Sequence, residues 1–308
     1  MKIVLPLTIV DSMIVAGTSI AEPDSSETAW VSAATYAVGD KRIRTTTHRI
    51  YKCASAHTGR TALPEADPTY WVDIGPTLRW APFDSYVSTP ATATGGITYV
   101  MRPGYCNAIA LYGLVGSSAT VSIKDSPGGT VIFNQTLSLY DDPAGWYEYL
   151  FLPVRPRTKL VFKNLPIRAN PEITISINSA SGGAVAVGMI VLGDYRSLVS
   201  ELADFGGTES GATAEPITYS YIKTADDGTT SIVRRHAATG MRAMVVMPRS
   251  DADAALRLVQ DVLDIPVGWV ASDEPGFDGL NVFGLGSARL TYTSAITAQM
   301  EINVKGMI

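Results

Sequence analysis

The chain has 308 residues and nearly balanced charge, with 24 Lys and Arg against 29 Asp and Glu and a formal net charge of −5. At roughly 100 to 200 residues per domain, this length predicts two or three compact units. The absence of a basic run or stripe argues against nucleic acid as a partner, and no stretch reaches the roughly 18 consecutive apolar residues of a membrane span. Charged residues make up only 17% of the chain, against about 25% in typical domains, which favours a protein that buries surface in an assembly.

Residues 1–27 begin with an apolar stretch that resembles a secretory signal in composition. Asp11 interrupts the apolar run, so we interpret the segment as an N-terminal β arm.

Residues 28–76 form a short segment that is rich in aromatic residues and ends in the linker-like sequence "DIGPT". A module of this size has a small core and depends on its aromatic side chains. Trp30, Tyr36 and Tyr51 are expected in that core. Tyr70 and Trp71 are adjacent, so in a strand they point to opposite faces, and one of them is then available to a ligand.

Residues 77–200 alternate apolar and polar side chains in several short runs, including "ATVSIKD", "TVIFNQTLSL", "KLVFKN" and "EITISIN". This period is typical of half-buried strands, and the Gly, Pro and Asp residues between the runs favour tight turns. The segment is therefore predicted to be an antiparallel β-sandwich.

Residues 201–308 are predicted to form a β-rich α+β domain with one helix. Two alternating runs around Asp227-Gly228 indicate a hairpin, and "MRAMVVMP" indicates a buried strand. A helix is expected over residues 250–264, with Ser250 as its N-cap and an apolar face of Leu256, Val259 and Leu263. The fold class is thus mainly β throughout.

Residues with catalytic or metal-binding chemistry are few. His48, Cys53 and His57 lack a fourth ligand and would separate onto two faces of a strand, so no metal site and no cofactor are predicted. No nucleophile motif accompanies His236. The acidic pairs Asp141-Asp142, Asp226-Asp227 and Asp273-Glu274 lie beside Gly or Pro, where Asp commonly bonds to its own backbone. No catalytic residue is assigned, and the chain is not expected to be an enzyme.

The aromatic segment nevertheless resembles the small chitin- and cellulose-binding modules of bacterial glycosidases. The matching residues are Trp30, Tyr36, Gly39, Asp40, Tyr51, His57, Gly59, Pro64 and Trp71. The resemblance implies sugar binding by aromatic stacking, and Tyr70, Trp71 and His57, supported by Trp30, are the expected glycan contacts.

The continuation from "YWVDIGPTLRWAPFD" into "ITYVMRPGYCNAIALYGLVGSSATVSI" resembles proteins of tailed bacteriophages and prophages, in which such a module precedes a sandwich similar to galactose-binding jelly rolls. This resemblance implies a structural protein of the tail tip or baseplate in the virion, assembled in the host cytoplasm. Its expected partners are other tail or baseplate proteins, further copies of itself in a homo-oligomer or ring, and host-surface glycan.

Two alternatives stay open. In the first, the chain is an assembly or spacer protein without glycan binding, and its aromatic residues are core residues. In the second, it is a polysaccharide-degrading enzyme that uses Asp141 and Asp142 or Asp226 and Asp227.

Overall fold

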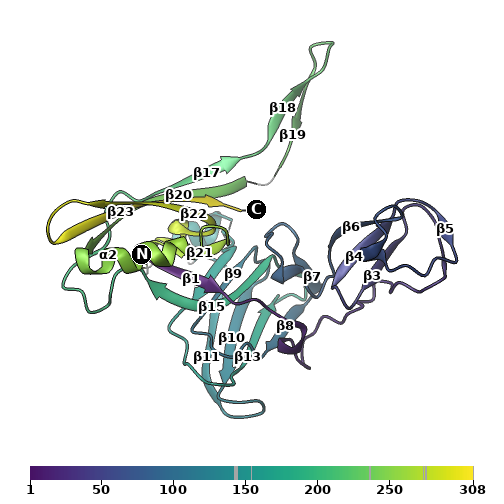
Figure 1. Cartoon of the computed structure of the whole chain (residues 1–308), viewed down its shortest axis with the longest axis horizontal. Coiled ribbons are helices and arrows are strands. Elements are labelled where there is room, and N and C mark those ends of the chain that lie inside the picture. The colour runs from purple at the N-terminus through teal and green to yellow at the C-terminus, as the bar shows by residue number, and fades with distance from the viewer. Residues whose placement is uncertain (142–144, 154, 236, 273, 275, 308) are drawn as a thin grey trace.

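A computed structural model describes residues 1–141, 145–153, 155–235, 237–272, 274 and 276–307. The protein is mainly β and its sheets are antiparallel, which confirms the predicted fold class. Figure 1 shows an aromatic-rich module on one side, a β-sandwich in the middle, a C-terminal part packed on the sandwich, and a narrow hairpin that projects from the C-terminal part.

The aromatic-rich module (residues 28–76) contains two small sheets. One has the order β3-β4-β6 and the other pairs β2 with β5. The strands are β2 (Thr35–Tyr36), β3 (Lys41–Arg44), β4 (Arg49–Cys53), β5 (His57–Thr58) and β6 (Trp71–Pro76). Tyr36, Tyr51, Cys53 and Trp71 form its buried core.

The sandwich packs a four-stranded sheet, of order β11-β10-β13-β8, against a sheet that contains β12-β9-β15. Its strands are β7 (Ala91–Thr94), β8 (Gly96–Met101), β9 (Ala108–Tyr112), β10 (Ser118–Lys124), β11 (Val131–Ser138), β12 (Lys159–Phe162), β13 (Glu172–Asn178), β14 (Ala184–Val187) and β15 (Met189–Ser197). In β10 every second side chain is buried, and in β13 Ile173, Ile175 and Ile177 are buried in the same way, because one face of each strand covers the core.

The N-terminal strand β1 (Lys2–Pro6) joins the sandwich to the C-terminal part. It pairs with β15 along its whole length and, on its other edge, with β21 (Val267–Val270). The two parts therefore share one sheet of order β12-β9-β15-β1-β21-β22-β23-β20-β16, in which β17 also pairs with β20.

The C-terminal part covers its share of this sheet with α2 (Arg249–Gln260). Its remaining strands are β16 (Gly207–Thr208), β17 (Thr213–Thr218), β18 (Tyr221–Thr224), β19 (Thr230–Val233), β20 (Ala237–Pro248), β22 (Asn281–Tyr292) and β23 (Thr297–Gly306). Ala252, Ala255 and Val259 of α2 pack into the core.

The predicted start and end of α2 are wrong. Pro248 occupies the N-cap, and Ser250 lies inside the first turn, where its hydroxyl donates to Asp251. Because α2 ends at Gln260, Leu263 falls beyond the helix and is exposed rather than part of its apolar face.

Two features protrude from this body. The hairpin arm, β18 with β19, is the hairpin predicted around Asp227-Gly228. The second is a solvent-exposed helix that the sequence did not predict, α1 (Trp146–Phe151), which follows β11 along the chain. Single 3-10 turns lie at η1 (Asp11–Met13), η2 (Pro64–Ala66), η3 (Ala81–Phe83) and η4 (Asp278–Leu280).

Candidate functional site

The predicted glycan residues His57, Tyr70 and Trp71 lie together in the aromatic-rich module. The His57 ring is 5.1 Å from the Tyr70 ring and 5.4 Å from the Trp71 ring, edge-on to both. Tyr36 closes the cluster, 4.9 Å from Trp71. The pairing of β2 with β5 sets Tyr36 opposite His57, which is why residues 21 positions apart in sequence meet here.

Trp71 is a core residue of this cluster. Only 3% of it is exposed, and Tyr36 is equally buried, with its hydroxyl donating to the Val31 carbonyl at 2.8 Å. A ring without accessible faces cannot stack on a sugar, so Trp71 is not available as the contact expected from the sequence. The strand argument does not apply to the pair, because Tyr70 lies in the turn before β6, where it is half-buried and packs against the same core as Trp71.

Tyr70 is covered in part by a cation. The Arg60 guanidinium lies 3.9 Å from the centre of the Tyr70 ring, and the Asp67 carboxylate holds it there by accepting from Nε at 2.9 Å. A planar guanidinium stacked on a ring is favourable in itself. What the module offers a ligand is therefore a surface of His57, Arg60 and Tyr70 rather than a bare aromatic platform.

Trp30 does not belong to the cluster of His57, Tyr70 and Trp71 but lies beside Arg44. The Arg44 guanidinium lies 5.4 Å from the Trp30 ring and donates to Glu65 at 3.2 Å. Trp30 is half-buried and packs against the core of the module.

The three potential metal ligands of this region do not converge. Cys53 is buried, and its thiol donates to the Ser55 carbonyl at 3.1 Å. The His57 Nδ1 atom is 3.7 Å from the Cys53 sulfur, whereas His48 is engaged elsewhere, with Glu22. Desolvation raises the pKa of the Cys53 thiol, which favours the neutral form over the thiolate that binds metal. Among the residues that the structure describes, no group of three or more His, Cys, Asp and Glu side chains is arranged to hold a metal ion.

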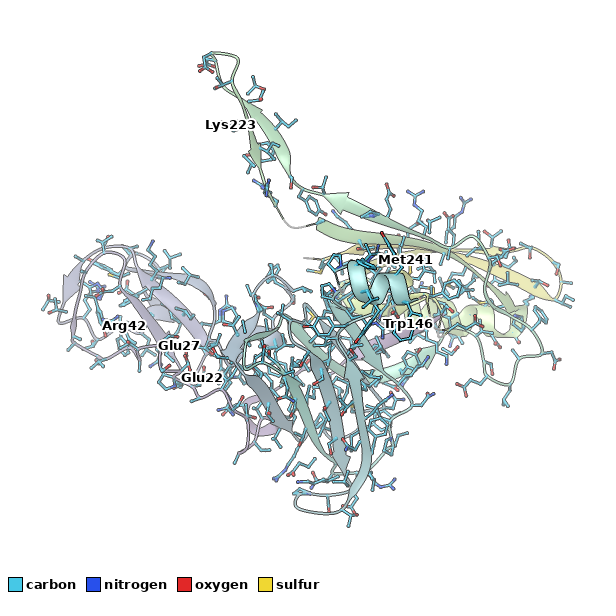
Figure 2. The ribbon with its side chains drawn as sticks, turned by 180° about the vertical axis from the view of Figure 1, so that it is seen from behind. Glu22, Glu27, Arg42, Trp146, Lys223 and Met241 are labelled. Carbon is cyan, nitrogen blue, oxygen red and sulfur yellow. The ribbon has the colours of Figure 1, made fainter. Side chains whose placement is uncertain are left out.

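A carboxylate that sequence reasoning missed lies between the module and the sandwich (Figure 2). Glu22 accepts from the Thr77 hydroxyl at 2.6 Å and from the Trp80 indole at 3.1 Å, and it lies 2.9 Å from His48 Nδ1. The His48 and Trp80 rings are stacked at 4.1 Å. Because the donors lie 26 to 58 residues from Glu22, no local pattern could have revealed this group.

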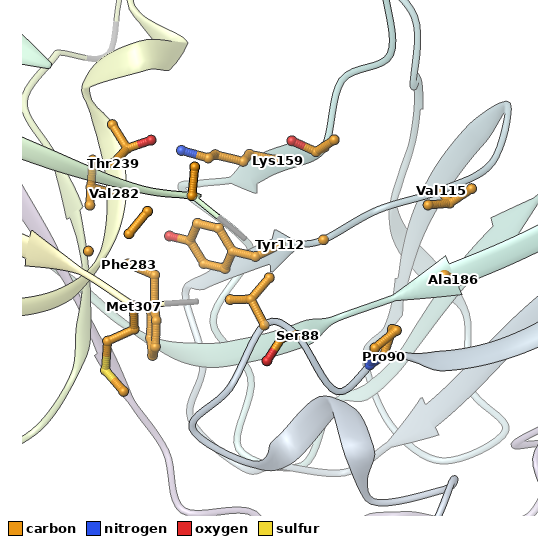
Figure 3. Close-up of a pocket in the computed structure, with 16 residues that line it drawn as sticks. Ser88, Pro90, Tyr112, Val115, Lys159, Ala186, Thr239, Val282, Phe283 and Met307 are labelled. Carbon is orange, nitrogen blue, oxygen red and sulfur yellow. The ribbon is translucent and has the colours of Figure 1, made fainter. Parts of the chain in front are cut away.

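A cavity of about 430 Å³ opens where the sandwich meets the C-terminal part (Figure 3). Tyr112, Val282, Phe283 and Met307 give it a largely apolar wall, and Lys159 supplies a cation. The Lys159 ammonium donates to the Asn281 carbonyl at 3.1 Å, and burial lowers its pKa while the nearby Asp278 opposes that shift. No sequence pattern indicates this cavity, since its walls come from six strands, β9, β12, β14, β20, β22 and β23, and from loops between them.

The described members of the acidic pairs considered as catalytic lie in turns or bends, or pair with an arginine. Asp227 accepts from the backbone and hydroxyl of Thr229, which lowers its pKa and closes the tip of the hairpin arm. Asp141 accepts from Arg157 at 2.6 Å. Asp142 and Asp273, like His236, lie outside the described residues.

No model of a known protein family matches the chain, nor does any curated protein or solved structure. Within the described part of the chain, no helix has the length and apolar character to cross a membrane.

Proposed function

We propose that the protein is a structural subunit of an oligomeric assembly, namely the tail tip or baseplate of a tailed bacteriophage or prophage. The observation that best supports assembly is the hairpin arm (Figure 1). The resemblance of residues 28–200 to tail proteins supplies the kind of assembly, and the low charge of the chain agrees with buried interfaces.

The hairpin arm lacks support from the rest of the chain. Among the described residues, β18 pairs only with β19, so the outer edge of each strand presents unused backbone groups. Ile222 and Ile232 face each other across the hairpin and are 68% and 67% exposed. An isolated two-stranded hairpin is marginally stable in water, and an exposed apolar edge is a template for pairing with another chain.

A neighbouring copy of the same chain is the partner that fits this arm best. A projecting element that docks at a different place on its neighbour makes a head-to-tail contact, and such contacts close into rings when the rotation allows. The shared sheet built around β1 gives the arm a rigid base.

The size of the protein in solution tests this proposal. Light scattering coupled to gel filtration is expected to show an oligomer for the wild type. Ile222→Ser combined with Ile232→Ser is expected to shift the protein toward monomer, whereas Leu202→Ser, which removes another exposed apolar side chain, leaves the oligomer intact. A monomeric wild type, or an arm variant that assembles normally, contradicts the proposal.

Host-glycan contact by the aromatic-rich module is a second candidate function. The half-buried surface of His57, Arg60 and Tyr70 favours it, because it combines a ring with hydrogen-bond donors, as sugar sites do. The burial of Trp71 favours the alternative of a spacer whose aromatic residues form a core. Several copies on one virion would strengthen weak contacts.

Binding of labelled protein to chitin-like polysaccharide and to intact host cells separates these two alternatives. Tyr70→Ala combined with Arg60→Ala is expected to abolish saturable binding, and Tyr86→Ala, an exposed tyrosine outside the module, serves as the control. Absence of binding by the wild-type oligomer would leave the module as a spacer. Release of reducing sugar from the same polysaccharides would instead favour the enzyme alternative.

A further inference from the structure

The helix α1 exposes an apolar surface that the other described residues leave uncovered (Figure 2). Five of its six residues are aromatic or leucine. Trp146 is 82% exposed and Phe151 70%, and Tyr147, Tyr149 and Leu150 are comparably open to solvent. Within the described chain, the ring contacts of its aromatics are with one another, Trp146 with Tyr149 and Tyr147 with Phe151.

Backbone contacts close the base of the loop that carries α1. Tyr140 and Pro156 form an isolated β-bridge, and the Asp141 amide donates to the Arg155 carbonyl at 3.0 Å. Arg157 donates to the Asp141 carboxylate at the same place. A helix this short is not stable in water by itself, and the described residues leave its side chains exposed, so it depends on packing from outside them.

We propose that α1 inserts into the interfacial region of a lipid bilayer. Trp and Tyr prefer the level of the headgroups, where the ring is in an apolar medium and its N–H or O–H reaches water. Leu150 and Phe151 supply the fully apolar part. At 1.5 Å per residue, α1 is about 9 Å long, which suits an element that lies within an interface rather than one that crosses it.

The distribution of these side chains favours lipid over a protein partner. At about 100° per residue, the five apolar positions spread over an arc of about 200°. A helix that packs on one protein face needs an apolar stripe about half as wide, whereas lipid surrounds every side that enters it. Charge does not contribute to this choice, since residues 141–157 carry Asp141, Asp142 and Glu148 against Arg155 and Arg157.

Flotation with vesicles tests the proposal on the intact protein. Wild-type protein is expected to float with mixed vesicles of phosphatidylcholine and phosphatidylglycerol and equally with vesicles of phosphatidylcholine alone, because the insertion is apolar. Trp146→Ser combined with Phe151→Ser is expected to lower the bound fraction by about tenfold or more. Leu202→Ser combined with Ile296→Ser removes comparable exposed apolar groups elsewhere and is expected to bind like wild type.

Fluorescence shows whether α1 itself enters the lipid. The wild-type spectrum is expected to shift to shorter wavelength with the mixed vesicles, and Trp146→Phe is expected to float normally without that shift. Failure of the wild type to float, or normal flotation of the Trp146→Ser, Phe151→Ser variant, overturns the proposal. Loss of oligomer by that variant, without lipid binding by the wild type, also overturns it and identifies α1 as a protein contact. The proposal does not depend on the assembly function, which has its own test in the hairpin arm.

Discussion

Two junctions hold this protein together, and they are built in different ways. Between the sandwich and the C-terminal part, β1 is hydrogen-bonded on both edges, so the backbone itself continues across the boundary. Between the aromatic-rich module and the sandwich, the contacts are mainly those of side chains: Glu22 collects the side chains of His48, Thr77 and Trp80. Glu27 accepts from the Leu78 amide, and one backbone bond runs from the Thr77 amide to the His48 carbonyl. A shared sheet makes two parts a single cooperative unit, whereas a side-chain junction can open while both parts stay folded.

The largest effect is expected from a charge placed in β1. Ile3 is fully buried in the core of the C-terminal part, and its strand also pairs with β15. Ile3→Asp buries an unpaired carboxylate and should lower the free energy of unfolding by about 4 kcal/mol or more. Denaturant unfolding should show both parts unfolding together, and Val10→Asp, at an exposed position, should change little. Separate unfolding of the two parts in wild type would contradict a shared unit.

A substitution that introduces no charge tests the same junction between the sandwich and the C-terminal part. Gly193 of β15 faces Pro6 of β1, and a methyl group on its Cα would collide with the Leu5 carbonyl. Gly193→Ala is expected to cost about 1 to 3 kcal/mol. Gly128→Ala meets open space but has a positive φ, so it measures the backbone strain of alanine alone and serves as a reference. An equal cost for both variants would mean that the close approach of β1 has no separate effect.

The side-chain junction should respond locally. Glu22→Ala leaves the buried Thr77 hydroxyl and the Trp80 indole without their acceptor, at a cost of about 1 to 3 kcal/mol. Limited proteolysis is expected to release residues 28–76 faster, while the melting of the sandwich hardly changes. Glu22→Gln keeps one acceptor oxygen and should lie between wild type and Glu22→Ala. If Glu22→Ala destabilised the sandwich as much as it destabilised the junction, the two parts would not be separable, which would contradict a side-chain junction that opens by itself.

The pH dependence within the sandwich gives the smallest expected effect. Lys124 and Arg102 donate to Glu172, which lowers the pKa of that carboxyl below its ordinary 4.5. A lowered folded-state pKa contributes stability that is fully present above pH 4.5 and is lost as the pH falls through the folded value. Unfolding measured between pH 7 and pH 3 should show this loss in wild type, and Glu172→Gln should flatten it. An unchanged profile would remove Glu172 as its source.

The sequence was informative where short-range periodicity decides structure. Alternation in "ATVSIKD" and "EITISIN" predicted β10 and β13, and Asp227-Gly228 predicted the hairpin arm. Contacts between distant residues were not predictable: nothing in residues 2–6 indicates that β1 pairs with both β15 and β21. The helix α1 was missed because its apolar residues have no polar face to set a helical period.

At the candidate site too, contacts between distant residues could not be predicted from the sequence. The sequence placed His57, Tyr70 and Trp71 in one module, but the alternation rule does not apply to Tyr70, which lies in the turn before β6. Which of the two is buried depends on the core that Tyr36 and Tyr51 form around Trp71, and the stacking of Arg60 on Tyr70 depends on Asp67. Those contacts are tertiary, and residue type alone does not specify them.

Hydrogen–deuterium exchange at several protein concentrations tests the assembly account most directly. If the hairpin arm docks on a neighbouring copy, the amides of residues 221–224 and 230–233 should become protected as concentration rises, while those of β10 stay protected throughout. Exchange in the arm that is fast and independent of concentration would contradict the account.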